Sequence, residues 1–198
     1  PGAGKGTQAK ILAAQNGLVH LSTGDILRDE VARDTELGRK AKGYMNRGDL
    51  VPDQLIIDMI KGRLDGDGGF ILDGFPRTAP QAEALEKIAT IDVAINIALS
   101  RGEVIRRLSS RRVCRECGKI YNLLYNAPKK EGVCDACGGE LFQRDDDKRD
   151  VIENRYDVYM DATSPLINFY KERGLLKDVD GSRETEKVSE QILMALRG

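Results

Sequence analysis

The chain has 198 residues, of which 40% are hydrophobic and 32% are charged, and its formal net charge is −1. A chain of this length can bury about 70% of its unfolded surface in one domain with insertions. The balanced charge excludes a global field that would attract nucleic acid or a membrane, so any anion site must be a local cluster of cations. No apolar run approaches the roughly 18 residues of a membrane span. We therefore expect a globular protein with neither nucleic acid nor membrane as a partner, and we further expect it to be cytoplasmic and monomeric.

The first eight residues, PGAGKGTQ, combine three glycines with a lysine and a threonine and lead directly into a helical pattern. Glycines let successive backbone N–H groups converge on one point, and a helix N-terminus also favours an anion. Compared with the general P-loop, Gly6 takes the place of the hydroxyl residue, which follows at Thr7. A glycine-rich turn without a ligand is the alternative, but Lys5 and Thr7 favour phosphate. We predict that six residues of this loop bind phosphate: Gly2, Ala3, Gly4, Lys5, Gly6 and Thr7.

Short apolar runs alternate with longer amphipathic stretches along the chain. Strands are expected at 19–21, 70–72, 93–99 and 176–179. Helices are expected at 5–15, 24–33, 35–47, 53–64, 78–89, 102–112, 148–172 and 184–197. Strands separated by helices indicate a parallel sheet covered on both faces, which is an α/β fold of the P-loop NTPase type.

A P-loop normally joins a buried strand to its helix. Here no strand and no initiator Met precede Pro1. We expect the chain to lack about eight residues at its N-terminus, a short strand plus a turn. With this strand restored, the sheet would have five strands.

Two segments interrupt the alternation of strands and helices. Residues 22–51 contain two helical patterns with no strand between them, which indicates a helical insertion. Residues 113–145 replace the helical pattern with Cys, Gly, Tyr, Asn and Pro, which indicates a small compact insertion. The core domain would then consist of residues 1–21, 52–112 and 146–198. A core with two insertions is the organisation expected of an enzyme that closes over its ligands.

The apolar run at 69–72 ends in Asp73. A carboxylate at the end of a strand beside a P-loop can hold Mg²⁺, usually through water molecules. We therefore expect Mg²⁺ near Asp73 and Thr7, with a helix-capping role for Asp73 as the alternative. The single histidine, His20, lies in a short strand and is expected to be structural or half exposed.

All four cysteines lie in two C-x-x-C pairs, and both pairs fall within residues 113–145. Their spacing, C-x₂-C-x₁₆-C-x₂-C, is typical of a four-cysteine zinc site. Four thiolates would close the coordination shell, so the zinc would be structural. Disulfides are the second interpretation and an iron site with the same ligands is the third. The predicted ligands are Cys114, Cys117, Cys134 and Cys137.

Three motifs occur in order along the chain: GAGKGT at 2–7, LSTGDILR at 21–28 and DGFPRT at 73–78. Together with RDDD at 144–147 and with Arg107, Arg111 and Arg155, they resemble the adenylate kinases over essentially the whole chain. That resemblance implies transfer of a phosphoryl group between ATP and AMP to give two ADP, with Mg²⁺. It also implies that residues 22–51 bind the monophosphate and that residues 113–145 form a lid. Some bacterial adenylate kinases carry a zinc-binding lid.

The resemblance assigns roles to individual side chains. Arg28 and Arg77 would grip the AMP phosphate, while Lys5, Arg111, Arg144 and Arg155 would surround the transferring group. Arg107 would lie nearer the ATP adenine. Arginine suits such work because its planar group holds two oxygens and stays charged. On the expected helix at 102–112, Arg107 and Arg111 would share one face. The residues implied at the AMP site are Thr23, Arg28, Val51, Gly74, Arg77, Gln81, Arg144 and Arg155.

Thr23 and Gln81 occupy positions that contact the AMP adenine in adenylate kinases, with backbone around Val51 completing the pocket. Thr23 could equally be a helix N-cap. Another acceptor base is the alternative within the kinase class. A nucleic-acid-binding zinc ribbon with an ATP-dependent switch is the alternative outside it, but basic and acidic residues are mixed in 113–145, so no basic face is expected there.

Overall fold

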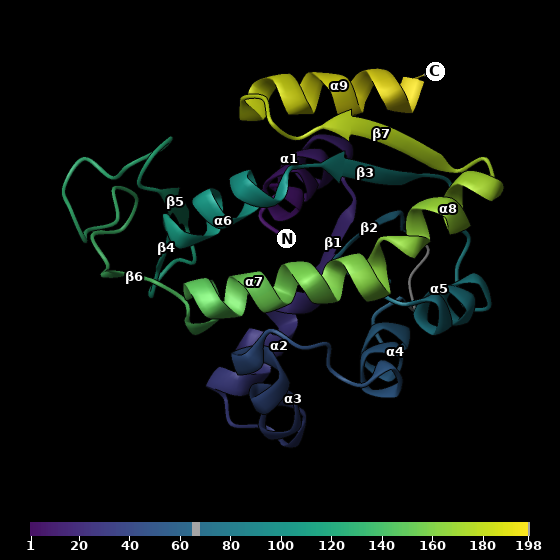
Figure 1. The fold of residues 1–198 in the computed structure, drawn as a ribbon, viewed down its shortest axis with the longest axis horizontal. Helices are drawn as coiled ribbons and strands as arrows, with labels where there is room; N and C mark the ends of the chain where they lie inside the picture. Colours follow the sequence, from purple (N-terminus) through teal and green to yellow (C-terminus); the bar gives the residue numbers. More distant parts are fainter. Residues whose placement is uncertain (65–67, 198) are drawn as a thin grey trace.

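The computed structural model describes residues 1–64 and 68–197, and its four parallel strands confirm the strands expected from the sequence (Figure 1). Strand β1 (Val19–Ser22) pairs with β2 (Phe70–Asp73), with Leu21 opposite Leu72. Strand β3 (Ala94–Ala98) pairs with β7 (Leu176–Asp180), with Ile97 opposite Val179. The fold is therefore α/β with parallel strands, as predicted.

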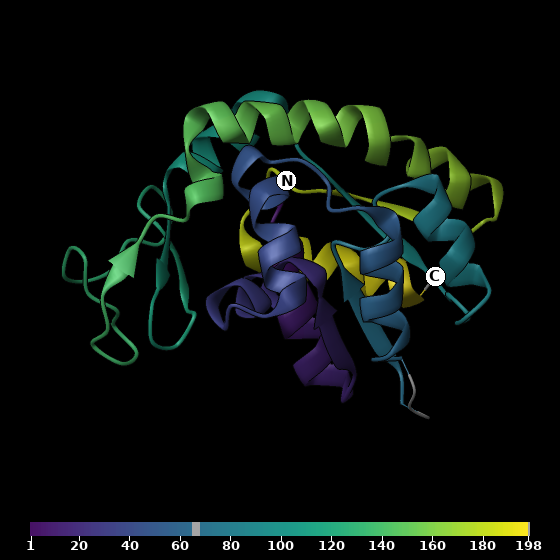
Figure 2. The ribbon, with the colours of Figure 1, turned by 90° about the horizontal axis from the view of Figure 1, so that it is seen from below.

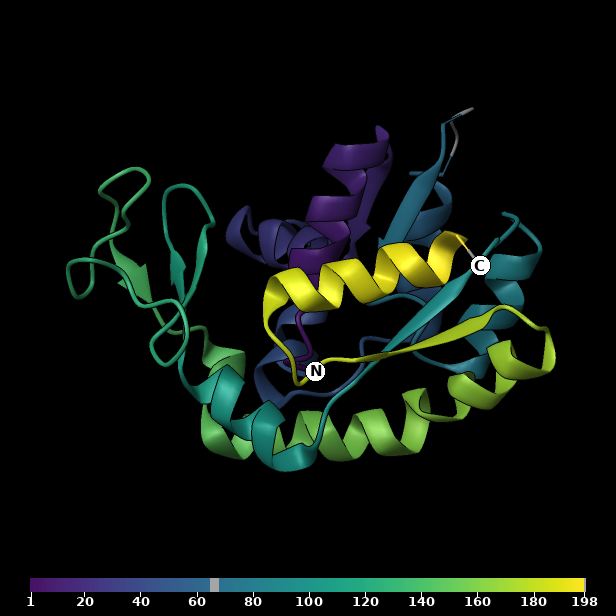
Figure 3. The ribbon, with the colours of Figure 1, turned by 90° about the horizontal axis from the view of Figure 1, so that it is seen from above.

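The four strands form two separate parallel pairs, which Figure 3 shows on either side of the gap between β2 and β3. Within the described part of the chain, β2 and β3 each have a hydrogen-bonded strand on only one side. A cavity of about 820 Å³ is lined by residues of both pairs, including Ile71 of β2 and Ile95 of β3. The same cavity reaches Lys5, so the strand ends open onto the predicted phosphate loop.

Most helices fall where the sequence predicts them, and hydroxyl side chains begin several of them. Ser22, Thr35, Thr78 and Ser100 each accept an N–H from the residue three positions later, as N-caps do. The helices are α1 (Lys5–Asn16), α2 (Thr23–Ala32), α3 (Glu36–Arg47), α4 (Asp53–Lys61), α5 (Ala79–Glu86), α6 (Arg101–Ser109) and α9 (Thr185–Arg197).

The single helix expected at 148–172 is wrong, because the structure divides this stretch into three parts. Helix α7 (Arg149–Val158) is followed by a π-helical turn (Tyr159–Thr163) and then by α8 (Pro165–Glu172). In the turn, the Ser164 N–H donates to the Tyr159 carbonyl at 2.8 Å, five residues back. Pro165 has no N–H to continue an α-helical ladder, so the hydrogen-bond register changes before it.

Helices cover the strands from two sides. On one side, Leu12 of α1 and Ile192 of α9 pack with Val179 of β7. On the other side, Leu166 of α8 and Ala82 of α5 form a second cluster beside β3 and β7. Helices α2, α3 and α4 gather below the strands in Figure 1, and Figure 2 shows them in front of α7. The strand ends and the phosphate loop thus lie between packed helices.

The segment from 111 to 142 folds into its own antiparallel sheet, which projects to one side of the molecule in Figures 1 and 2. Strand β4 (Arg111–Cys114) lies between β5 (Ile120–Asn122) and β6 (Leu141–Phe142). The helix expected at 102–112 therefore ends early, at Ser109, where the Ser109 and Ser110 hydroxyls donate to carbonyls of the last turn. Side chains that bind their own backbone in this way compete with helical continuation. Arg111 consequently begins a strand.

Candidate active site

The glycine-rich loop folds back against two neighbouring elements before α1 begins at Lys5. Gly2 and Gly4 both have positive φ, at 68° and 86°, which glycine adopts without strain. A Cβ on Gly2 would lie 3.2 Å from the Leu108 side chain, and one on Gly6 would lie 3.0 Å from Asp73 Oδ2. The loop therefore lies close to the end of β2, with the N-terminus of α1 beside it.

Lys5 lies near Asp73 and a group of arginines. Although the Lys5 side chain is exposed to the cavity, protein surrounds it, and this desolvation lowers the pKa of Lys5 to about 8. Asp73 opposes the shift, while Arg77, Arg155 and Arg111 add to it. A cluster of positive charges that destabilise one another favours a bound anion.

Asp73 ends β2, as predicted, but it does not cap a helix, because Thr78 caps α5. His20 lies on the neighbouring strand β1, with its Nε2 atom 3.6 Å from Asp73 Oδ2. The half-buried position expected for His20 is confirmed. Its contact with Asp73 could have been anticipated only from the register of β1 against β2.

Two arginines are held by a fully buried carboxylate. Arg111 donates from Nε and Nη2 to the two oxygens of Asp147, at 2.7 and 2.6 Å, and Asp147 is 0% exposed. Arg155 of α7 lies 3.3 Å from Asp147 and 3.0 Å from Asp146. Bidentate pairing fixes the plane of a guanidinium group. The prediction that Arg107 and Arg111 share a helix face is wrong, because Arg111 lies on β4.

A second set of ion pairs joins α2 to the segment after β6. Arg28 binds Asp25 at 2.6 Å and lies 3.9 Å from Asp146. Arg144 lies 3.8 Å from Asp25. Burial, followed by repulsion from Arg28 and Arg111, lowers the pKa of Arg144 to about 10. Burial alone would raise the pKa of Asp146, but Arg155 and Arg28 lower it, so this carboxylate stays ionised.

Arg77 lies at the loop after β2, close to Thr23. Its Nε donates to the Gly74 carbonyl at 2.7 Å, and the Thr23 hydroxyl donates to the same carbonyl at 2.8 Å. Gly74 has φ 77°, and a Cβ there would lie 2.8 Å from Arg77 Nη2. Burial, with repulsion from Arg155, lowers the pKa of Arg77 to about 10. Thr23 is not the N-cap of α2, because Ser22 holds that position.

The cavity collects most of the predicted nucleotide-binding side chains from distant parts of the chain. Arg111 and Arg144 are not among its lining residues, but Arg111 shares Asp147 with Arg155, and Arg144 shares Asp25 with Arg28, and both Arg155 and Arg28 line the cavity. Of the predicted residues, those that line the cavity are Ala3, Lys5, Thr23, Arg28, Val51, Asp73, Gly74, Arg77, Gln81 and Arg155.

Arg107 lies apart from these residues. It donates to Glu103 of its own helix and to the carbonyls of Gly181 and Ser182, at 2.8 and 3.3 Å. The guanidinium group thus joins α6 to the loop before α9. Tyr125 also contacts this region, because its hydroxyl donates to Glu103 at 2.7 Å and its ring lies 5.7 Å from Arg107.

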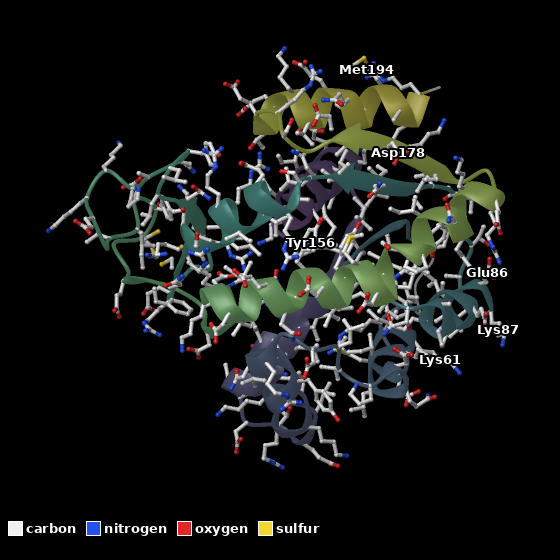
Figure 4. The ribbon with its side chains drawn as sticks, in the orientation of Figure 1. Lys61, Glu86, Lys87, Tyr156, Asp178 and Met194 are labelled. Carbon is white, nitrogen blue, oxygen red and sulfur yellow. The ribbon has the colours of Figure 1, made fainter. Side chains whose placement is uncertain are left out.

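The four cysteine sulfurs converge within 4.8 Å of one another, in the segment at the left of Figure 4 where sulfur is drawn yellow. Cys114 Sγ lies 3.4 Å from Cys137 Sγ, and Cys117 Sγ lies 3.6 Å from Cys134 Sγ. All four thiols are free, and a disulfide would need about 2.05 Å, so the disulfide interpretation does not describe this structure. Four converging sulfurs fit the shell of a tetrahedral Zn²⁺ ion.

Tyr121 binds the second cysteine pair, a contact that no local sequence pattern indicates. It is 1% exposed, its hydroxyl accepts the Asp135 N–H at 2.8 Å, and it lies 3.5 Å from Cys134 Sγ. The carboxylates Asp146 and Asp147 were likewise quoted only as part of a motif. A run of three aspartates directly after Arg144 is the sequence signal for their pairing with cations.

Known proteins are similar to this chain over nearly its whole length. A family model described as adenylate kinase matches residues 1–175. An adenylate kinase of Methanocella arvoryzae is 54% identical over 205 residues, covering 100% of this chain and 95% of that protein. One of Archaeoglobus fulgidus is 51% identical over 200 residues (97% and 92%), and one of Caldicellulosiruptor saccharolyticus is 49% identical over 204 (99% and 95%). The chain belongs to the adenylate kinase family.

Proposed function

We propose that this protein catalyses the reversible, Mg²⁺-dependent reaction ATP + AMP = 2 ADP. Membership of the adenylate kinase family supports the reaction. The observation that supports assigning this reaction to particular residues is a single cavity with the proposed phosphate loop at its edge. Cations from four separate stretches of the chain line this cavity. Phosphoryl transfer needs mainly positioning and positive charge on the phosphate oxygens, and this arrangement supplies both.

Each cation has a role in this proposal. Arg28 and Arg77 hold the AMP phosphate, while Lys5, Arg111, Arg144 and Arg155 surround the transferring group. Asp147 positions two of the cations around the transferring group. Its bidentate pair orients Arg111, and its contact with Arg155 restricts the conformations of that side chain. Repulsion among the cations is relieved when an anion enters, so phosphate binding is favoured electrostatically.

The glycine-rich loop, residues 2–7, would hold the ATP phosphates through its backbone N–H groups. Arg107 would lie nearer the ATP adenine, at the loop formed by Gly181 and Ser182. Mg²⁺ would bridge phosphate oxygens and offset their charge. Asp73 and Thr7 are the residues proposed to hold its water shell, because Asp73 Oδ2 lies beside the loop at Gly6.

The monophosphate base would lie against Thr23, Gln81 and Val51. Gln81 and Thr23 are each 2% exposed and Val51 is 6% exposed, and all three line the cavity. A wrong base would leave buried polar groups unpaired, at a cost of about 1–3 kcal/mol. We propose AMP as the acceptor, with another nucleoside monophosphate as the alternative.

Residues 113–145 would form a lid in which zinc, rather than iron, joins the two cysteine pairs. This segment is about 33 residues long, below the size at which an apolar core usually holds a unit together. Closed four-thiolate coordination leaves no position for substrate, so this zinc would be structural. Residues 22–51 would bind the monophosphate, and residues 1–21, 52–112 and 146–198 would form the core.

We also propose that the protein is a cytoplasmic monomer and that neither nucleic acid nor a membrane is its partner. Cysteines that are free and paired by C-x-x-C spacing suit a reducing compartment. Among the described residues, no helix combines the length and apolar character needed to cross a membrane.

A coupled assay with ATP and a panel of AMP, GMP, UMP and CMP tests the assignment. AMP should be used about 5- to 150-fold better than each of the others, the equivalent of one unpaired buried group. Equal turnover of UMP and AMP would contradict the adenine assignment of Thr23 and Gln81.

A further inference from the structure

The side-chain amide of Gln81 is tied at both ends. It lies in the first turns of α5 and is 2% exposed. Its Oε1 accepts the backbone N–H of Arg77 at 2.8 Å, and its Nε2 donates to Oδ1 of Asp53, in α4, at 2.7 Å. Asp53 lies 28 positions earlier in the sequence, so the fold brings the pair together.

These two neighbours allow only one orientation of the amide. A backbone N–H can only donate, so it requires the amide oxygen, and an ionised carboxylate can only accept, so it requires the amide nitrogen. Rotating the amide by 180° would direct Oε1 at the Asp53 carboxylate and the NH₂ group at the Arg77 N–H. Both contacts would then be repulsive, in a place where unpaired buried groups are costly.

We infer that Asp53 is a specificity-determining residue, which fixes the order in which Gln81 presents its free hydrogen-bonding positions to a purine. This inference rests on the proposed function, in which Gln81 lies against the monophosphate base. With both ends tied, Gln81 keeps one lone pair on Oε1 and one N–H on Nε2. That acceptor and that donor cannot exchange places while Nε2 donates to Asp53 and Oε1 accepts the Arg77 N–H.

The positions of the donor and the acceptor on Gln81 matter because 6-aminopurines and 6-oxopurines carry opposite hydrogen-bonding groups at the same edge of the ring. Adenine carries a 6-amino donor beside the N1 acceptor, whereas a 6-oxopurine carries an O6 acceptor beside an N1–H donor. One orientation of a glutamine amide matches the first pattern and the reversed orientation matches the second. Asp53 therefore selects 6-aminopurine monophosphates against 6-oxopurine monophosphates, without touching the base.

The substitution Asp53→Asn tests this, because it keeps the shape but lets the partner either donate or accept. A reversed Gln81 amide would then meet one repulsive contact, at the Arg77 N–H, instead of two. AMP should be compared with IMP, which differs from AMP only at the edge in question. We expect the ratio of kcat/KM for AMP to that for IMP to fall about tenfold, mainly through a lower KM for IMP. If Asp53→Asn melts below the assay temperature, Asp53→Ser offers a second partner that can donate or accept.

The same helix provides a matched control. Gln54 donates to Asp58 at 2.7 Å, which is also an amide–carboxylate pair. This pair is exposed, and neither residue forms the hydrogen bond between Gln81 and Asp53. Asp58→Asn should leave the AMP/IMP ratio unchanged. Asp53→Asn should change the ratio while retaining turnover of AMP, which separates specificity from folding.

Each outcome has a distinct meaning. A selective wild-type protein whose AMP/IMP ratio is unchanged by Asp53→Asn, or whose two kcat/KM values fall equally, would overturn the inference and leave the proposed function intact. If Gln81→Ala leaves the ratio unchanged, or if the wild-type protein does not discriminate AMP from IMP, the proposed base site itself fails and the inference with it.

Discussion

Two clusters of functional side chains in this molecule are built in opposite ways. The cation cluster, defined as Lys5, Arg28, Arg77, Arg111, Arg144 and Arg155, is drawn from a span of about 150 residues. The cysteine cluster, Cys114, Cys117, Cys134 and Cys137, lies within 24 residues of sequence. The first therefore exists only when the whole core has folded, whereas the second can form from its own short segment, held by the metal that we propose.

The two clusters also differ in how they affect the stability of the fold. Burial, together with repulsion from neighbouring arginines, lowers the pKa values of Lys5 and Arg77 in the cation cluster, and Asp73, Asp25, Asp146 and Asp147 offset part of that repulsion. This stored repulsion favours phosphate. The cysteine cluster lies in a segment with few buried apolar residues, so a metal bound there would contribute to stability instead. Loss of the first should reduce catalysis, and loss of the second should reduce stability.

Removing Lys5 should give the largest effect and separate the clusters most sharply. Lys5→Met should lower kcat by several orders of magnitude, because a cation is lost from the transferring phosphate. The melting temperature should stay near that of the wild type, because burial and the neighbouring arginines already disfavour the charged lysine in the folded protein. Lys10→Met, on the exposed side of α1, is the matched control and should keep its activity. Parallel losses of activity and melting temperature would indicate that Lys5 is structural.

Removing the metal should give the converse result. Zinc analysis should find one metal per chain, and a strong chelator under reducing conditions should lower the melting temperature. A four-thiolate zinc site supplies roughly 10–16 kcal/mol of apparent binding energy in small peptides, enough to hold such a segment. Detecting four free thiols and no metal in the protein as purified would remove the zinc site from the account.

The smallest expected effect concerns pH and Lys5. Its pKa is about 8 in the ligand-free site, against an ordinary value of 10.5, so the positive charge is lost as pH rises through about 8. We expect kcat/KM for ATP to fall above about pH 8, while kcat falls only at higher pH, since bound phosphate favours the charged form. The contribution of Lys5 to the stability of the fold changes in the opposite direction. It rises between pH 8 and 10.5, because the unfolded state binds the proton more tightly there and loses it as the pH increases. A kcat/KM profile that stays flat to pH 10 would show that this charge does not titrate there.

The sequence predicts the cysteine cluster well and the cation cluster only in part, and the reason is physical. C-x-x-C spacing constrains four ligands locally, and the sulfurs indeed converge. The four parallel strands and most helices also follow from local periodicity and hydroxyl caps. The helical pattern at 102–112 predicts a helix that includes Arg111, but the serines before it end α6 and the chain turns into β4.

Contacts between distant residues account for what sequence reasoning missed. Nothing local pairs Arg111 with Asp147 or Gln81 with Asp53, because these partners are 36 and 28 positions apart. The division of residues 148–172 at the π-helical turn has a local signal in Pro165, because proline cannot continue an α-helical hydrogen-bond ladder. Carboxylates that position cations therefore need the fold, whereas ligands that bind a metal in C-x-x-C pairs can be identified beforehand.

The most direct test of this comparison is the rate of phosphoryl transfer from ATP to AMP in folded, zinc-free protein. The measurement is made with Mg²⁺ restored and below the lowered melting temperature, with circular dichroism to confirm folding. The account predicts that much of the wild-type rate is retained, because the cation cluster needs only the core and its carboxylates. Complete loss of turnover in demonstrably folded, zinc-free protein would contradict it, and would mean that the cysteine cluster takes part in the reaction.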